Sequence, residues 1–328
     1  MRFATSLLSI VLLVTSTACS GTPTNCTTKF ISIGTGGTGG VYYPYGGALA
    51  RLISEKVPCL QATAEVTGAS VDNLKLMHQG KVDVALTLAD ALAEGVAGTG
   101  PFAESGAVAN VRTVAVLYTN YTHVVARAGA GFRKVADLRG KVVSVGSPGS
   151  GTELLADRLL IAAGLDPRKD ITRHTLGVAE SAGALKDGKV DAFFWSGGVP
   201  TAAVEDLAAT PGLQIALLPQ GDLLASLQSL VDGRLYRLAT LPGGSYGGIA
   251  ADTPTIGVSN LLVASSTLDE GLVEAIVRTM FENKAALVAA HPEAAHLELL
   301  TSGDGLPAPL HPGALKYYRE RGAMKNVP

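Results

Sequence analysis

ISIGTGGTG at residues 31–39 and VSVGSPGSG at residues 143–151 are two copies of one glycine-rich stretch, and they decide the fold. All positions but one are identical or conservatively replaced at an offset of 112 residues. A second match, GKVDVA at 80–85 and GKVDAF at 188–193, has an offset of 108 residues and follows helix-like stretches at 71–78 and 179–186. Each copy predicts a strand, a glycine-rich turn, a helix, a strand, a helix and a third strand, the alternation of a parallel sheet. The duplication therefore predicts an α/β fold with two lobes.

The chain is expected to cross between these lobes in two extended segments. The first has strand-like segments at 111–118 and 122–127, separated by Thr119, Asn120 and Tyr121, and the second is 255–264. Two crossings make a hinge. We therefore expect a first lobe of residues 30–118 plus 254–328 and a second lobe of residues 122–253. The first lobe should include a helix at 268–291, which Pro292 ends, and a terminal helix at 313–321.

The N-terminus predicts export. Met1-Arg2 is followed by a short apolar stretch at 7–14, by Ser16-Thr17-Ala18 and then by Cys19, which is typical of a bacterial lipoprotein signal. We expect a signal peptide at 1–18, lipid on Cys19, a linker at 19–29 and an extracytoplasmic protein held on the membrane by its lipid. Ordinary cleavage after Ala18 is the alternative.

Composition excludes several classes of function. The 328-residue chain is 47% hydrophobic and only 16% charged, with a formal net charge of -2, so it lacks the basic surface that nucleic acid requires. No apolar run after residue 18 reaches the roughly 18 residues of a membrane helix. Glycine is abundant, with 39 residues, which suggests that another group, such as a ligand, approaches the backbone closely. No resident cofactor is indicated.

Cys26 and Cys59 remain as a pair once Cys19 is assigned to lipid. Each precedes a strand-like run, at 30–33 and 61–66, and the starts of two parallel neighbouring strands lie at one edge of a sheet. In an oxidising compartment these positions predict a disulfide. Two buried free thiols are the alternative.

Both glycine-rich turns lie between a strand and a helix, where backbone N–H groups and the helix dipole favour an anion. The alternative is a tight turn with no ligand. Gly34, Gly36 and Gly39 also fit a dinucleotide fingerprint with Glu65, but export argues against a nicotinamide cofactor. No Gly-Lys-Ser/Thr follows, so a phosphate-binding Walker loop is excluded.

Catalytic and metal-binding patterns are weak. Gly243-Gly244-Ser245-Tyr246-Gly247 has the spelling of a nucleophile elbow, which leaves a secreted serine hydrolase using Ser245 as an alternative function. The residues after it resemble a loop rather than the helix that an elbow opens. His291 and His296 lack the spacing of a helical metal pair, and the other histidines are scattered, so no metal site is expected.

Five segments in order resemble the TAXI family, the extracytoplasmic solute receptors of TRAP transporters. They are GTGGTGGVYYP at 34–44, TAEVTGASVDNL at 63–74, SVGSPGSGTE at 144–153, GVPT at 198–201 and LHPGA at 310–314. The resemblance implies a two-lobed type II periplasmic-binding-protein fold and delivery of solute to a TRAP membrane permease. It also implies a small anionic solute such as glutamate, glutamine or 2-oxoglutarate. Trp195-Ser196-Gly197 departs from the smaller aliphatic residues common there.

We expect a binding protein, not an enzyme, that closes its lobes on a small carboxylate. The second turn, Ser147 to Thr152, should supply the main anion grip, and the first, Thr35 to Gly39, should orient the rest. A stand-alone solute-sensing lipoprotein is a further alternative. The residues expected to contact the solute are Thr35, Gly36, Gly37, Tyr42, Ser70, Asn73, Ser147, Ser150, Gly151, Thr152 and Trp195.

Overall fold

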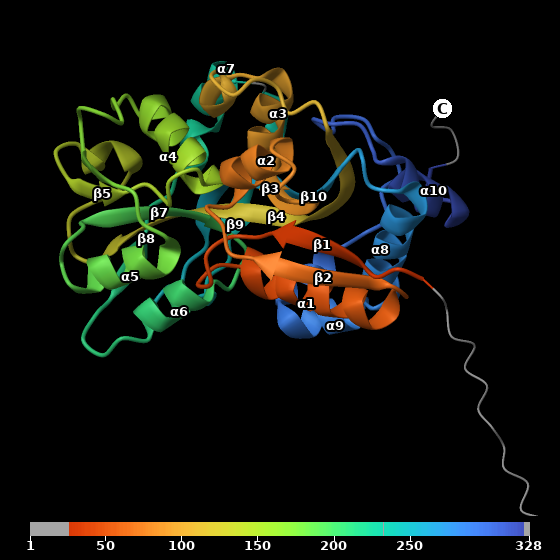
Figure 1. Ribbon diagram of the computed structural model, residues 1–328. Coiled ribbons are helices and arrows are strands. Elements are labelled where there is room, and N and C mark those ends of the chain that lie inside the picture. Colours follow the sequence, from red (N-terminus) through yellow and green to blue (C-terminus); the bar gives the residue numbers. More distant parts are fainter. Residues whose placement is uncertain (1–25, 232, 325–328) are drawn as a thin grey trace, which may run out of the picture.

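The computed structural model describes residues 26–231 and 233–324, which form one mixed ten-stranded sheet with helices on both faces (Figure 1). The expected signal peptide and lipidated Cys19 lie outside these residues. The main strand order is β2-β1-β3-β10-β4-β7-β5-β6, with β8 paired to β4 and β9 to β10.

The strands are β1 (Lys29–Gly34), β2 (Leu60–Glu65), β3 (Val84–Leu88), β4 (Val111–Arg127), β5 (Val142–Ser144), β6 (Thr172–His174), β7 (Ala192–Gly197), β8 (Ile215–Leu217), β9 (Tyr236–Leu241) and β10 (Thr253–Ser265). The α-helices are α1 (Tyr42–Lys56), α2 (Ser70–His78), α3 (Ala89–Ala97), α4 (Gly151–Ala162), α5 (Val178–Lys186), α6 (Ala202–Ala208), α7 (Leu224–Leu230), α8 (Glu270–Glu282), α9 (Lys284–Ala290) and α10 (Pro312–Glu320). The 3-10 turns are η1 (Gly100–Phe102), η2 (Val135–Leu138), η3 (Gly221–Leu223), η4 (Gly233–Leu235) and η5 (Pro292–His296).

The two sequence copies have the same topology. In the first copy, β1 pairs in parallel with β2 and β3, and in the second, β5 pairs in parallel with β6 and β7. The aspartate of the repeated GKVD sequence has one role in both copies. The Asp83 carboxylate accepts the backbone N–H of Ser32, and that of Asp191 accepts the N–H of Val142, each at 2.8 Å. The predicted duplication is confirmed at the level of topology.

Strands β4 and β10 join the two copies. Strand β10 is antiparallel to both β3 and β4, and β4 is also antiparallel to β7. The expected break at residues 119–121 is wrong, because β4 is one continuous strand whose residues there pair with β10, and Tyr121 also pairs with β7. The division into a lobe of residues 30–118 plus 254–328 and a lobe of 122–253 stays a prediction whose boundaries fall within or at the ends of these strands. The first lobe is the part of the molecule that carries the first copy, and the second lobe is the part that carries the second copy.

Apolar residues cover both faces of the sheet. Helices α2, α3 and α4 lie above it in Figure 1 and share one buried cluster that includes Leu74, Leu92, Leu155 and Leu159. On the other face, α1 packs with α8, α9 and α10 in the first lobe, while α5 and α6 pack in the second. One buried cluster therefore extends through both lobes and the strands that join them.

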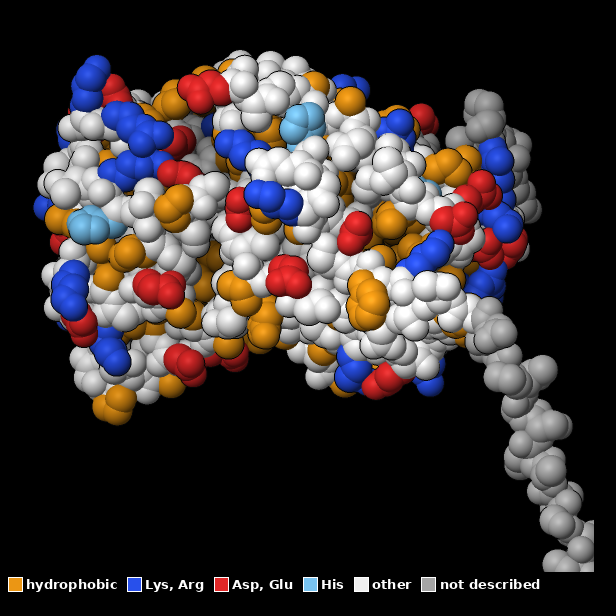
Figure 2. All heavy atoms as spheres, in the orientation of Figure 1, with side chains coloured by type: hydrophobic (Ala, Val, Ile, Leu, Met, Phe, Trp, Pro, Cys, Tyr) orange, Lys and Arg blue, Asp and Glu red, His pale blue; other side chains and the backbone are white. Residues whose placement is uncertain are grey.

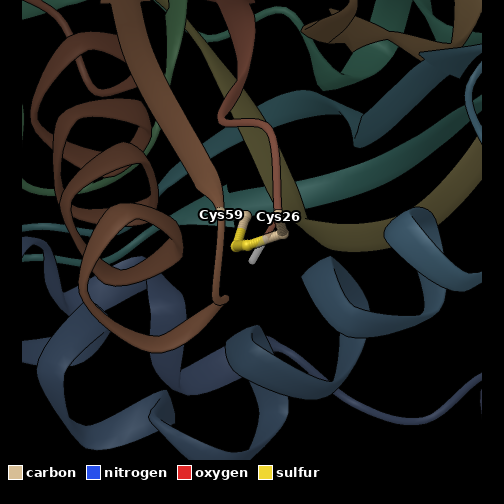
Figure 3. Close-up of a disulfide and its surroundings, with 2 residues drawn as sticks. All are labelled: Cys26 and Cys59. Atoms are coloured by element: carbon tan, nitrogen blue, oxygen red, sulfur yellow. A yellow bond between two sulfur atoms is a disulfide. The ribbon is translucent and has the colours of Figure 1, made fainter. Parts of the chain in front are cut away.

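Cys26 and Cys59 form a disulfide at the start of β1 and β2 (Figure 3). Their Cα atoms are 6.1 Å apart, within the range of about 4.4–6.8 Å that a disulfide requires. The neighbouring parallel register pairs Lys29 with Leu60, as expected from the strand-helix-strand order.

The C-terminal helices follow the predicted pattern with one correction. The expected helix at 268–291 is two helices, because Asn283 leaves the helical conformation between α8 and α9 and its side-chain amide donates to the carbonyl of Thr279 at 2.9 Å. Within the described part of the chain, no helix is long and apolar enough to cross a membrane.

Candidate ligand-binding site

A cavity lies between the two copies. Its lining comes from the turns after β1 and β5, from the loops before α2 and α5, and from strands β4 and β7. Figure 2 shows a hollow between the part of the molecule that carries α4 to α6 and the part that carries α1 to α3, with hydrophobic side chains at its base. Clefts between lobes are common sites for small molecules.

The amino ends of four helices converge on this cavity. Val41, Ala69, Ser150 and Gly177, the residues that precede α1, α2, α4 and α5, all line it. The first N–H groups of a helix have no acceptor within the helix and carry its positive dipole end. A side-chain cap is present only at α4, where Ser150 Oγ accepts the Glu153 N–H at 3.0 Å. The cavity thus offers many donors to an anionic group.

Only one of the described residues lining the cavity carries a charged side chain, and this residue, Glu180, is exposed. A solute carboxylate in this cavity would therefore depend on backbone N–H groups and hydroxyls, with no guanidinium or ammonium beside it.

The lobes approach closely at positions that glycine permits. A Cβ on Gly40 would lie 2.7 Å from the Trp195 ring, and one on Gly151 would lie 2.6 Å from Leu88. Backbone N–H groups also donate hydrogen bonds across from one lobe to the other. The Asp72 N–H donates to the carbonyl of Gly149 at 3.0 Å, and the Val199 N–H donates to Glu293 Oε1 at 2.6 Å. Larger residues at either glycine would hold the cleft open.

Ala69 has an unusual backbone conformation at the start of α2. Its φ of 78° and ψ of -143° lie in a region that residues other than glycine rarely adopt. Such residues gather at functional sites, where surrounding structure holds them in place. The position of Ala69 on the cavity wall fits that pattern.

A chain of polar side chains forms the cavity floor. Tyr42 OH donates to Asn260 Oδ1, and the Asn260 amide donates to Asn120 Oδ1. The Asn120 amide then donates to Ser196 Oγ at 3.2 Å, and the Ser196 N–H donates to Thr152 Oγ1 at 3.1 Å. The chain passes from α1 through β10 and β4 to β7 and α4, so hinge strands and both copies share one hydrogen-bonded network.

Trp195 forms a wall of the cavity and is held from behind. Its Nε1 donates to Thr201 Oγ1 at 2.9 Å, and its strand register places it opposite His123. His123 is fully buried, and its Nε2 bonds to Tyr246 OH at 2.8 Å. Burial lowers the pKa of His123 to about 4, so the imidazole is neutral at pH 7.

Most residues expected to contact the solute do line the cavity; they are Gly36, Gly37, Tyr42, Ser70, Ser147, Ser150, Gly151, Thr152 and Trp195. Thr35 and Asn73, which were expected there too, are fully buried and lie outside the lining. The Thr35 hydroxyl donates to the carbonyl of Glu65 at 2.6 Å. The Asn73 amide donates to the carbonyls of Thr35 and Leu86, each at 2.8 Å, so both residues serve the backbone of the turns.

Sequence reasoning missed the start of α5 and the polar residues of the hinge strands. Gly177 and Val178 line the cavity, and the offset of 108 residues maps Ser70 onto Val178, so the repeat itself contains this signal. Tyr118 and Asn120 on β4 also line it, and the polar floor is completed by Asn260 on β10. Each of these two apolar hinge strands contains one asparagine, and this polar residue in an apolar run was the sequence signal for the cavity floor.

The enzyme and metal alternatives gain no support from the geometry. Ser245 lies in the connection between β9 and β10, outside the cavity lining, and its hydroxyl donates to the carbonyl of Pro242 at 2.7 Å. The next element after it is strand β10 and not a helix, so the requirement of an elbow is not met. Among residues 26–231 and 233–324, no group of three or more His, Cys, Asp or Glu side chains could hold a metal ion.

Residues 33–322 match the NMT1-like family. The chain belongs to the NMT1-like family. Its fold is similar to that of an ancestral arginine-binding protein bound to arginine, with 14% identity, a TM-score of 0.50 and coverage of 80% of this chain and 97% of the other. It is also similar to a putative L-cystine ABC transporter protein from Listeria monocytogenes, with 13% identity, a TM-score of 0.50 and coverage of 83% and 99%.

The alkanesulfonate-binding protein SsuA from Xanthomonas axonopodis pv. citri, bound to MOPS, matches with 18% identity, a TM-score of 0.47 and coverage of 90% and 84%. At these identities the likeness to the arginine-binding and cystine proteins concerns the fold alone. The NMT1-like chain therefore has the expected α/β fold of type II periplasmic-binding-protein architecture, with a mixed sheet.

Proposed function

We propose that the protein is an extracytoplasmic solute receptor of a TRAP transporter, which captures a small carboxylate between its lobes and delivers it to the membrane permease. The observation that carries this proposal is the convergence of four helix amino ends on one cavity between the two copies. Membership of the NMT1-like family and the binding-protein fold are consistent with it. The solute is glutamate, glutamine or 2-oxoglutarate, or a molecule of similar size.

Capture works by closure. Donors from α1 and α2 lie on one side of the cavity and donors from α4 and α5 on the other, so a carboxylate that touches both favours the closed state. The hydrogen bond from Asp72 to Gly149 and the packing of Gly40 on Trp195 belong to that closed state. Closure exposes a surface that a permease can distinguish from the open form.

Calorimetric titration of the soluble chain with L-glutamate, L-glutamine and 2-oxoglutarate tests the ligand class, after a thermal-shift screen of amino acids and carboxylates. We expect saturable binding of at least one carboxylate without turnover. Binding of none of them, with binding of a neutral or cationic solute instead, would contradict the proposal. Uptake of the bound solute by cells with and without the gene then distinguishes a transport receptor from a stand-alone sensing lipoprotein.

The membrane attachment is a separate proposal. We propose that lipid on Cys19 anchors the chain on the outer side of the membrane, and mass spectrometry of membrane-extracted protein should show a diacylated N-terminal peptide. An unmodified N-terminal cysteine would contradict it.

A further inference from the structure

The four helix ends at the cavity differ in the charge that accompanies them. Three of the helices carry an acidic residue in the first turn: Asp72 in α2, Glu153 in α4 and Glu180 in α5. Helix α1 has none. A carboxylate in the first turn neutralises the positive end of the helix dipole, so the four ends are not equivalent sites for an anion.

Two of these carboxylates also occupy backbone donors beside the cavity. Asp72 Oδ2 accepts the N–H of Gly68 at 2.8 Å, and Glu153 Oε2 accepts the N–H of Gly149 at 2.9 Å. Glu153 further pairs with Arg173 at 2.7 Å, so the charges around the start of α4 are already balanced. The Ser150 N–H is also used, because it donates to the carbonyl of Ser147 at 3.1 Å.

The start of α1 keeps its donors. The N–H groups of Val41, Tyr42 and Tyr43 precede the first bond within the helix, from the Tyr45 N–H to the carbonyl of Val41 at 3.2 Å. No side-chain cap accepts from them. The glycine-rich turn before α1, residues 36–40, lines the cavity along its whole length.

A second observation at the same place is the hydroxyl of Tyr118. This residue lines the cavity and is only 3% exposed, and its hydroxyl has no hydrogen-bond partner among the described residues. Its ring stacks on Tyr45 of α1 with centroids 6.2 Å apart. Tyr118 and Asn120 are two positions apart on β4, so their side chains lie on one face of the strand, the face of the cavity floor. A buried hydroxyl without a partner costs free energy unless a ligand satisfies it.

Resting on the proposed function, we infer that the anionic group of the solute lies on the amino end of α1 and accepts a hydrogen bond from the Tyr118 hydroxyl. The start of α4 then closes over the rest of the molecule. This reverses the roles that the sequence suggests for the two glycine-rich turns, and it restricts the solute to molecules whose carboxylate reaches the first lobe.

Tyr43 offers a matched test of charge, because it is the second residue of α1, is 37% exposed and does not line the cavity. Tyr43→Glu and Tyr43→Gln differ only in charge. The glutamate should stabilise the empty helix and yet weaken binding of L-glutamate or 2-oxoglutarate by about fivefold or more relative to the glutamine variant, since it neutralises the helix end. Calorimetry gives the affinities and thermal unfolding gives the stability of the empty proteins.

Tyr118→Phe tests the hydroxyl. If the hydroxyl binds the anion, the variant should lose about tenfold in affinity for the same probes while the empty protein unfolds at an equal or higher temperature. Unchanged affinity would overturn the role of Tyr118. Equal affinities of Tyr43→Glu and Tyr43→Gln, with wild-type binding intact, would overturn the inference and leave the proposed function standing. Failure of the wild type to bind any carboxylate would overturn both.

Discussion

The two copies share one topology but hold their glycine-rich turns differently. In the second copy, Ser150 caps α4, and Glu153 ties the turn to the helix and pairs with Arg173. In the first copy, Val41 provides no side-chain cap, and the first turn of α1 contains no acidic residue. Duplication has kept the backbone path while the charges at the helix ends have diverged. A turn that uses the N–H groups of Gly149 and Ser150 internally suits closure, and a turn without a cap or an acidic residue suits an anion.

Other differences follow the same division. The first copy has the disulfide between β1 and β2, whereas β5 and β6 have only their short parallel ladder. The second copy has Trp195 in its cavity wall, with His123 and Tyr246 behind it. Both copies use an aspartate to join their first and third strands. The two copies therefore use matching residues within the sheet, and they differ in the residues at the edge of the sheet that borders the cavity.

The largest loss of stability is expected from a substitution at the ion pair that joins the two copies. Arg158 on α4 pairs with Asp90 on α3 at 2.9 Å, with only 8% and 1% of their side chains exposed, and also with Glu94 and Tyr236. Arg158→Met leaves Asp90 buried without its cation, and removing one partner of such a pair costs about 3–5 kcal/mol. Equilibrium unfolding in urea at pH 7 measures the loss.

Arg51 supplies the control for Arg158, because its pair with Glu55 has half-exposed side chains on α1. Arg51→Met should cost about 0.5 kcal/mol or less. Similar unfolding midpoints for the two variants would show that the ion pair between the copies contributes little.

The second predicted loss of stability comes from removing the disulfide, which only the first copy has. The disulfide closes a loop with a sequence separation of 33 residues, which in the chain-entropy model contributes about 4 kcal/mol. Cys26→Ser/Cys59→Ser should lower stability by that order in a soluble form that begins at residue 20. Calorimetry with and without reductant gives the same comparison in the wild type. Two thiols that titrate in denatured protein without reductant would refute the bond.

The third predicted change in stability concerns His123, on the joining strand β4 beside the second copy, and it depends on pH. Burial lowers the pKa of His123 to about 4 in the folded protein, against about 6.5 in the unfolded chain. Between these two pKa values the unfolded chain binds a proton at His123 more readily than the folded protein does. The free energy of unfolding is therefore unaffected by this group above pH 6.5 and decreases as the pH falls towards 4, by about 3 kcal/mol in all. Urea unfolding at pH 7.5 and 4.5 should show a smaller acid loss for His123→Asn than for the wild type. Equal losses would mean that other groups carry the acid sensitivity.

The fold could be predicted from the sequence because its signals are local and repeated. Strand, glycine-rich turn and helix follow one another within about 25 residues, and the offset between copies supports each element twice. The carboxyl ends of parallel strands meet at one edge, so the turns after β1 and β5 predicted where the cavity lies. The break at 119–121 was wrong because a polar Thr-Asn-Tyr run suggests a turn unless both neighbouring strands are known.

The site could be predicted only in part, because residue type does not give the direction of a polar atom. Thr35 and Ser150 both lie beside glycines, yet the hydroxyl of Thr35 serves a backbone carbonyl outside the cavity. The face of Tyr118 and Asn120 depends on the register of β4, which shifts against β10 near Leu261. Such a shift is set by long-range pairing, which single-sequence patterns do not contain.

The smallest predicted change, that of Ser150→Ala, decides which of the two glycine-rich turns makes the main contact with the anion. Ser150 is 6% exposed, and its Oγ accepts the Glu153 N–H at 3.0 Å, so Ser150→Ala removes a helix cap worth about 1 kcal/mol of stability. With the anion on α1, affinity for L-glutamate should fall less than about tenfold, the loss typical of a hydrogen bond to a charged group. Ser150→Thr keeps an oxygen that can accept the same N–H and should recover the stability. Calorimetry and urea unfolding on both variants separate the two roles. A tenfold or larger loss of affinity in Ser150→Ala, recovered by Ser150→Thr, would return the main anion contact to the second copy, as the sequence suggests.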